Sequence, residues 1–265
     1  MKITSIIILA LILIITGSCK KNISEPYSVQ QFTIQSKSNS GSYDIKVALP
    51  DNYDVNKKYA TIYVLDGEDN FDFVACYSKK LSCKYYKNNV LVVSIGYGNN
   101  RTLDYTPTSA SEGQGGGPSF MNFMQNELIP RMESDFSVDT NRSCRVILGH
   151  SFGGLLAAYA FTKYNSVFGN YLILSPSLWY DDEIILQYEQ DNRSIINNKN
   201  QLVFMGIGQL ENSGRMQAPF EAFYQRLNNY YSGIKLQKKS EKWLDHVGSK
   251  NPNIIKGLDF YFQNK

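Results

Sequence analysis

A serine flanked by glycines lies between a stretch typical of a strand and one typical of a helix. Residues 146–148 are apolar, residues 149–154 read Gly-His-Ser-Phe-Gly-Gly, and residues 155–161 have the composition of a helix. A strand, a tight turn with a central serine and a helix form a nucleophile elbow, and the glycines leave room where strand and helix crowd each other. The pattern predicts Ser151 as a nucleophile, and a chance Gly-x-Ser-x-Gly match is the alternative.

A serine hydroxyl needs a base to take its proton, and histidine is the usual base because its pKa lies near neutrality. The chain contains only two histidines, His150 and His246. His150 lies within the serine turn, where we expect it to pack locally. His246 follows the last predicted strand, at the edge of the sheet where sites form in α/β proteins. His246 is therefore the predicted base, and a surface loop histidine is the alternative.

The acid that orients the base should follow a central strand and precede the histidine in the chain. Glu211 follows the fifth predicted central strand and meets both conditions. Asp181 and Asp182 follow the preceding strand and remain competitors. Asp245 adjoins His246, and adjacent side chains rarely face each other. We predict Glu211 as the acid.

Two backbone N–H groups are predicted to stabilise an oxyanion. The N–H of Phe152 lies at the start of the helix after the serine, where the helix dipole adds positive potential. The second donor is expected from the turn at residues 66–68, where Gly67 allows a close approach to the substrate, and we assign it to Glu68. This turn can also simply cap a helix, and both roles are compatible.

The remaining pattern is that of strands alternating with helices, which predicts a mostly parallel sheet with helices on both faces. A long segment at 96–117 reads as irregular, and Pro130 is expected to kink the helix that contains it. The predicted strands are 31–36 and 43–49 (an antiparallel pair), 60–65, 89–95, 144–148, 171–174, 202–207 and 234–238, and the predicted helices are 71–81, 120–136, 182–188, 215–231 and one containing 258–262.

The N-terminus has the features of an export signal. A basic start is followed by an apolar run over residues 6–15 and by Thr-Gly-Ser-Cys at 16–19. Small residues directly before a cysteine resemble a bacterial lipoprotein cleavage box, which would make Cys19 the lipidated first residue of the mature protein. We therefore divide the chain into a lipoprotein signal (1–18), a tether (19–27) and one domain (28–265), lipid-anchored in the bacterial cell envelope. A plain signal peptide or a short anchor is the alternative.

Composition limits the other partners. The formal net charge is only +3, and no basic stripe interleaved with aromatic residues is present, so nucleic acid is not expected as a partner. No Cys and His cluster has zinc-like spacing, so no metal site is predicted. Cys76 and Cys83 could pair in an exported protein or stay as two unpaired thiols, and Cys144 is expected to be a buried free thiol.

From about residue 45 onward the chain resembles the esterase D-type esterases of the α/β-hydrolase superfamily. The segments that carry the resemblance are 63–67, 98–107, 127–130, 149–154, 174–179 and 246–249. Residues 101–107 are most similar to the branch with siderophore triester hydrolases. The resemblance implies an α/β-hydrolase fold and serine ester hydrolysis through Ser151, Glu211 and His246, without a metal or cofactor.

Three further residues could line the substrate pocket: Arg101, Tyr105 and Trp179. An arginine beside the site suits an anionic or catecholate substrate, but it can equally be tied to loop carbonyls, and the tryptophan can equally belong to the core. The expected partner is a small-molecule or glycan ester. A siderophore esterase is the first functional hypothesis. A carbohydrate esterase that removes feruloyl or acetyl groups is the second, and a non-catalytic binding module on a hydrolase scaffold is the alternative of another class.

Overall fold

A computed structural model describes residues 27–265, except 86–89, 99 and 197–198. Its main sheet has eight strands in the order β1-β2-β4-β3-β7-β8-β9-β10. The strands β1 and β2, and β2 and β4, pair antiparallel, whereas the other neighbours are parallel. The bounds are β1 Ser28–Gln35, β2 Ser42–Leu49, β3 Ala60–Val64, β4 Val90–Ile95, β7 Arg145–His150, β8 Asn170–Leu174, β9 Gln201–Gly208 and β10 Ile234–Glu241.

The burial of each strand follows its sequence. Every residue of β3, β4 and β8 is buried, as continuous apolar runs require when helices cover both faces of a sheet. The edge strand β1 alternates between exposed and half-buried residues. The predicted antiparallel pair at the amino end of the domain and the predicted central strands are therefore confirmed.

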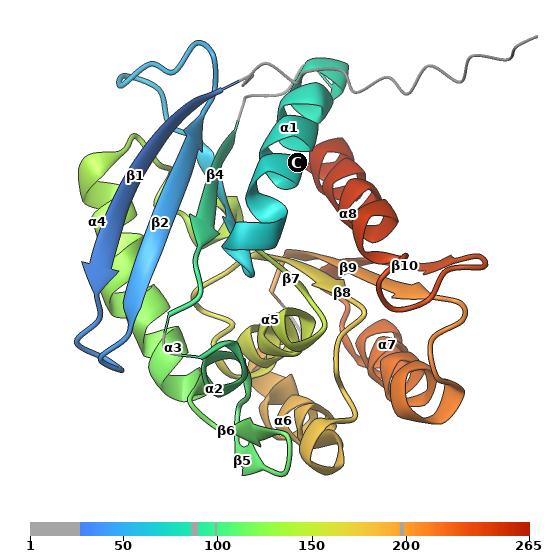
Figure 1. The fold of residues 1–265 in the computed structure, drawn as a ribbon. Coiled ribbons are helices and arrows are strands. Elements are labelled where there is room, and N and C mark those ends of the chain that lie inside the picture. Colours follow the sequence, from blue (N-terminus) through green and yellow to red (C-terminus); the bar gives the residue numbers. More distant parts are fainter. Residues whose placement is uncertain (1–26, 86–89, 99, 197–198) are drawn as a thin grey trace, which may run out of the picture.

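Helices cover both faces of this sheet (Figure 1). The helices α1 (Gly67–Tyr85) and α8 (Lys250–Asn264) pack together on one face over a core that includes Val64, Leu148 and Leu172. The other face is covered by α3, α4, α5, α6 and α7, around a second core that contains Tyr63 and Ile147. Their bounds are α3 Gly117–Phe123, α4 Ile129–Asp135, α5 Phe152–Lys163, α6 Tyr180–Ile196 and α7 Ala218–Tyr230.

The predicted helix 120–136 is interrupted by a wider turn. Between α3 and α4 lies the π-helical turn η1 (Met124–Leu128), closed by a hydrogen bond from the N–H of Ile129 to the carbonyl O of Met124. Pro130 directly follows this turn. Proline has no N–H and its ring clashes with the carbonyl four residues earlier, so the chain accommodates it by a turn of larger diameter.

The segment predicted as irregular at 96–117 contains short ordered elements. They are the helix α2 (Arg101–Tyr105) and a small hairpin of β5 (Ser109–Ala110) and β6 (Gly113–Gln114). The side chain of Asn100 accepts hydrogen bonds from the N–H groups of Thr102 and Leu103 and so caps α2. Asp104 is buried and accepts a hydrogen bond from the hydroxyl of Tyr43 at 2.8 Å, which fastens the segment to β2.

The structure decides the pairing that the sequence left open for two cysteines and corrects the burial expected of the third. Cys76 and Cys83 are free thiols, seven positions apart on the single helix α1. A helix rises about 1.5 Å per residue, which separates them by roughly 10 Å and exceeds the reach of a disulfide. Cys144 is free but only half-buried, so the expected buried thiol is wrong. It precedes β7 instead of lying within it.

The proposed signal, Cys19 and the tether up to residue 26 lie outside the described residues. Within the described part of the chain, no helix is both long and apolar enough to cross a membrane.

Candidate active site

The serine turn is a sharp, sterically restricted corner between β7 and α5. Ser151 has φ 61° and ψ −120°, a left-handed backbone that a non-glycine residue adopts only under constraint. A Cβ on Gly149 would lie 2.2 Å from the carbonyl O of Gly153, and one on Gly154 would lie 2.6 Å from the carbonyl O of Leu174. The crowding predicted for Gly149 is present. At Gly153 it is milder, with the nearest atom 3.2 Å away.

The two neighbouring parallel strands also end in left-handed turns. Asp66 after β3 has φ 54°, and Ser175 after β8 has φ 40°. Because parallel strands have their carboxyl ends at one edge, these turns lie beside Ser151. Sites in α/β sheets form at this edge.

His246 and Glu211 are joined by a hydrogen bond between Nδ1 and Oε2 at 2.8 Å. Glu211 is buried, whereas the side chain of His246 is 37% exposed. Burial alone would raise the pKa of the Glu211 carboxyl, but hydrogen bonds from His246, the Ser175 hydroxyl and the N–H of Gly208 outweigh it and hold the pKa below its ordinary value. Glu211 therefore stays ionised and accepts from the imidazole.

The other oxygen of Glu211 is held just as firmly. Oε1 accepts from Ser175 Oγ at 2.7 Å and from the N–H of Gly208 at 2.7 Å. Two of the competing aspartates, Asp181 and Asp245, have other partners. Asp181 accepts from Thr108 Oγ1 at 2.5 Å, and Asp245 accepts from the N–H of Gly248 at 2.8 Å.

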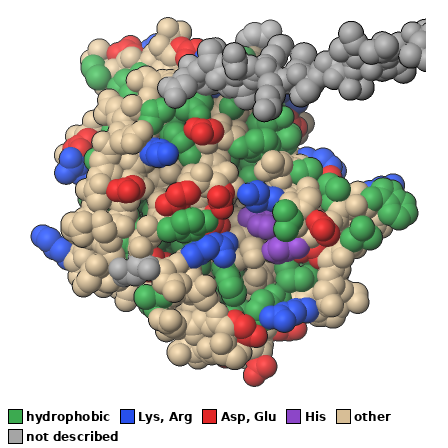
Figure 2. Space-filling model, in the orientation of Figure 1, with side chains coloured by type: hydrophobic (Ala, Val, Ile, Leu, Met, Phe, Trp, Pro, Cys, Tyr) green, Lys and Arg blue, Asp and Glu red, His purple; other side chains and the backbone are tan. Residues whose placement is uncertain are grey.

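The two histidines lie together on one face of the molecule (Figure 2). Their ring centroids are 4.6 Å apart, and His150 Nε2 lies 3.0 Å from the carbonyl O of His246. His150 is 8% exposed, and burial, followed by the proximity of His246, lowers its pKa to about 4. The expectation of local packing missed this contact, which joins residues 96 positions apart.

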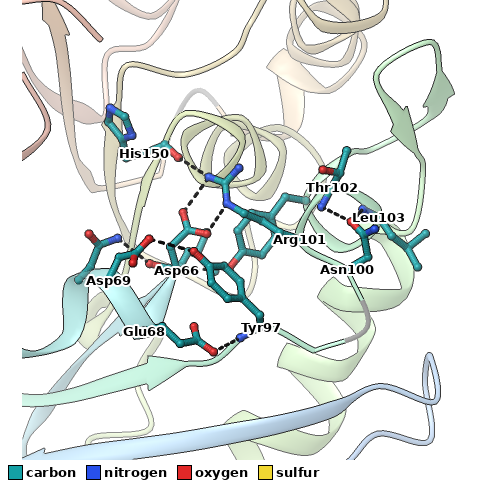
Figure 3. Close-up of polar contacts among 12 residues, drawn as sticks. Asp66, Glu68, Asp69, Tyr97, Asn100, Arg101, Thr102, Leu103 and His150 are labelled. Carbon is teal, nitrogen blue, oxygen red and sulfur yellow. Dashed lines mark hydrogen bonds and ion pairs between the residues drawn. The ribbon is translucent and has the colours of Figure 1, made fainter. Parts of the chain in front are cut away.

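Arg101 connects the Asp66 turn to the serine turn (Figure 3). Its Nε and Nη2 donate to the two carboxylate oxygens of Asp66 at 2.5 and 2.9 Å, and Nη2 also donates to the carbonyl O of His150 at 3.2 Å. Burial raises the pKa of Asp66, and Arg101 opposes that shift. Two of the three guanidinium nitrogens are thus engaged within the protein, which is the structural role that the sequence left open for Arg101.

The two predicted oxyanion donors lie at helix starts. Phe152 is the first residue of α5 and Glu68 the second of α1, where backbone N–H groups have no acceptor within the helix. The Glu68 side chain points to the loop after β4, where its Oε1 accepts from the N–H of Tyr97 at 2.6 Å (Figure 3). Arg101 thus binds Asp66, directly before α1, and the carbonyl of His150, two positions before α5 begins at Phe152.

The structure corrects the pocket assignment of Tyr105. This side chain is 2% exposed, and its hydroxyl accepts from the N–H of Asp66 at 3.0 Å. Tyr105 belongs to the core beneath Arg101 because α2 folds back onto the domain, a long-range event that local sequence does not reveal.

Trp179 does line a hollow close to the serine turn. Its ring centroid lies 6.1 Å from that of Phe152, and the Arg215 guanidinium lies 3.6 Å from the centre of its ring. The hollow has a volume of about 460 Å³ and is lined by Ala110, Ser111, Glu112, Trp179, Asp181, Asp182 and Arg215. The sequence analysis did not identify Arg215, which lies shortly after Glu211 in the chain.

One wall of this hollow has an unusual backbone. Asp181, Asp182 and Glu183 have φ values of 47°, 50° and 61°, and so form a run of left-handed residues without glycine. Each such residue costs about 1–2 kcal/mol relative to a right-handed one. The hydrogen bond from Thr108 to Asp181 helps to hold this turn.

Among the described residues, no group of three or more His, Cys, Asp or Glu side chains is arranged to hold a metal ion. The groups that lie at the carboxyl edge of the sheet are a serine, an imidazole paired with a carboxylate, and backbone N–H groups at two helix starts.

This fold and edge geometry define an α/β-hydrolase. The structure superposes on the BES protein from Bacillus cereus with a TM-score of 0.80 and 25% sequence identity, over 98% of both chains. The predicted fold class, with a mostly parallel sheet between two helical layers, is confirmed.

The sequence matches the family model Esterase, described as "Putative esterase", over residues 36–245, and the chain belongs to this family. It is 26% identical to the ferri-bacillibactin esterase BesA of Bacillus subtilis, over 73% of this chain and 75% of that protein. It is 29% identical to the siderophore triacetylfusarinine C esterase of Aspergillus fumigatus, over 47% of this chain and less than half, 46%, of that protein. The protein is a carboxylic ester hydrolase, as predicted.

Proposed function

We propose that this protein hydrolyses siderophore esters through a covalent acyl-serine intermediate. Ser151 Oγ attacks the ester carbonyl carbon while His246 takes its proton. The C–O bond to the alcohol then breaks, and His246 returns the proton to the leaving oxygen. Water, deprotonated by the same imidazole, attacks the acyl carbon; the bond to Ser151 Oγ breaks, Oγ takes the proton back from His246, and the acid is released. Glu211 holds the imidazole and stabilises the imidazolium, and the N–H groups of Phe152 and Glu68 stabilise the oxyanion.

The observation that carries the mechanism is the 2.8 Å hydrogen bond between His246 Nδ1 and a buried, ionised Glu211. A carboxylate on Nδ1 fixes the tautomer whose Nε2 lone pair can accept the serine proton. The ring of this histidine packs against His150, the residue directly before Ser151. The base and the proposed nucleophile therefore belong to one cluster at the carboxyl edge of the sheet.

The substrate class rests on the relatives and on the hollow beside the serine turn. Of the two relatives described above, one is named as a siderophore triacetylfusarinine C esterase and the other as a ferri-bacillibactin esterase. The hollow offers an aromatic ring, Trp179, and a guanidinium, Arg215, next to Phe152. Aromatic faces and planar cations suit the flat, electron-rich chelating groups of siderophores.

The decisive experiment measures hydrolysis of p-nitrophenyl acetate and of a ferric siderophore ester by wild type, Ser151→Ala and Ser232→Ala. Ser232 is exposed in the turn before β10, at the opposite edge of the sheet, and serves as the matched control. We expect Ser151→Ala to lose both activities while Ser232→Ala keeps them. Turnover that survives in Ser151→Ala would reject the nucleophile. A preference for feruloyl or acetyl sugars in kcat/KM would reject the siderophore assignment and leave the mechanism standing.

We also propose that the protein is exported and lipid-anchored through Cys19 in the bacterial cell envelope. This proposal rests on the N-terminal sequence pattern alone. Incorporation of labelled fatty acid into the wild-type chain, and its loss in Cys19→Ala, is the expected result. Equal labelling of both chains would reject the anchor.

A further inference from the structure

His150 joins the serine turn to the loop that carries His246. A backbone carbonyl oxygen can only accept a hydrogen bond, so the 3.0 Å contact requires that His150 Nε2 carries the proton. The partner is the backbone of His246, not its ring. The contact therefore holds the backbone of the loop at His246 itself, while Glu211 fixes the orientation of the imidazole.

The surroundings of His150 keep it a neutral donor. Its burial and the nearby His246 lower its pKa, and Glu211 and Lys250 are the other charged groups that act on it. A neutral His150 does not repel the imidazolium that forms on His246 during the reaction. The donor thus stays in place in both protonation states of the base.

The loop between β10 and α8 is also held at Trp243, whose N–H donates to Gln209 Oε1 at 3.2 Å, and at Leu244, whose carbonyl O accepts from the N–H of Leu210 at 2.9 Å, both ahead of His246. Trp243 and Val247 on either side of it are 78% and 76% exposed. The carbonyl of His246 has one further neighbour, the hydroxyl of Ser249, at a longer 3.4 Å. The short bond from His150 is therefore the main tie between this carbonyl and the sheet.

We propose that His150 is a positioning residue, whose Nε2–H holds the backbone of His246 at the distance from Ser151 that proton transfer requires. This inference rests on the proposed serine esterase function. In this proposal, the histidine of the Gly-His-Ser-Phe-Gly-Gly turn contributes to the reaction by a hydrogen bond, in addition to its packing.

The test compares three substitutions at this position. A glutamine amide reaches the place of Nε2 and can donate to the same carbonyl, an asparagine amide reaches only the place of Nδ1, and leucine fills space without a donor. Loss of one such hydrogen bond corresponds to roughly a 10-fold change in rate. With p-nitrophenyl acetate we expect His150→Leu and His150→Asn to lower kcat about 10-fold with little change in KM, and His150→Gln to restore most of it.

Asn170→Leu is the matched control. Asn170 is buried at the start of β8, and its Nδ2 donates to the carbonyl O atoms of Ser143 and Arg145 at 2.8 and 3.2 Å. The substitution removes both of these hydrogen bonds, which lie at the amino ends of the strands, the edge of the sheet opposite Ser151. We expect this variant to lose stability and to keep its kcat.

The outcomes separate the two proposals. Absence of ester hydrolysis in wild type, or its persistence in Ser151→Ala, rejects the proposed function. If wild type is active and depends on Ser151, wild-type kcat in His150→Leu rejects the positioning role, as does an equal loss of kcat in Asn170→Leu. If His150→Leu does not fold, the glutamine and asparagine variants decide, and equal kcat in those two rejects the role.

Discussion

Replacement of Arg101 by methionine should impair both stability and turnover. Methionine retains an apolar side chain over Tyr105 but removes the paired contacts to Asp66 and the contact to the carbonyl of His150. The Asp66 side chain is only 6% exposed, so its carboxylate would be left buried without its partner. Breaking such a pair costs about 3–5 kcal/mol.

The effect on turnover has a different origin. Arg101 ties together the two turns that precede Glu68 and Phe152, the proposed oxyanion donors. Removal of one oxyanion donor lowers kcat by about 100- to 1000-fold, and displacement should cost less than removal. We expect a loss of roughly 10- to 100-fold in kcat for p-nitrophenyl acetate. Urea unfolding measures the loss of stability in parallel.

A double variant separates the two effects. Asp66→Asn in the Arg101→Met background removes the buried charge, so much of the stability should return. The turns remain untied, so kcat should stay low. Recovery of kcat together with stability would refute the reasoning, because it would show that Arg101 acts only by neutralising Asp66. Wild-type kcat in a folded Arg101→Met would refute it as well.

Three further outcomes follow from other parts of the structure. Burial raises the pKa of Asp104 to about 6, so ionisation of this carboxyl lowers the stability of the folded protein as pH rises toward and through that value. The Tm of Asp104→Asn, measured by scanning calorimetry, should therefore rise relative to the wild-type Tm between about pH 4 and pH 7. Ser175→Ala removes a 2.7 Å bond to the Glu211 carboxylate; it should raise the pKa of Glu211 and lower kcat roughly 10-fold, with the acid limb of the kcat/KM profile moved to higher pH. Glu189→Gln disrupts a fully buried carboxylate bound by two arginines and a tyrosine; it should cost about 3–5 kcal/mol in urea unfolding and leave kcat of the folded enzyme unchanged.

The strands of the sheet could be predicted from the sequence because a strand that is buried on both faces requires a continuous apolar run. The strands near residues 60–65 and 171–174 follow that rule, and the order of turns along the carboxyl edge then brings Ser151, Glu211 and His246 to one side. Rules of this kind act locally or through topology, so a single sequence contains them.

The contacts that sequence could not supply are long-range and depend on side-chain packing. Arg101 meets Asp66 and His150 across 35 and 49 positions. Tyr105 was predicted to face the substrate and is buried, because α2 turns back onto the domain. The left-handed turn at residues 181–183 contains no glycine, so the sequence does not predict it. Surrounding contacts such as the hydrogen bond from Thr108 to Asp181 stabilise it.

The left-handed turn at residues 181–183 has a consequence for the thermodynamics of binding. A backbone held in a sparsely populated conformation by its surroundings has few alternatives to give up when a ligand arrives. This side of the hollow is therefore preorganised, because the conformational entropy of its backbone is already lost when the chain folds and not when a ligand binds. Titration calorimetry should then show a smaller entropic penalty for wild type than for a variant with glycine at Asp182, whose turn gains conformational freedom in the unbound protein.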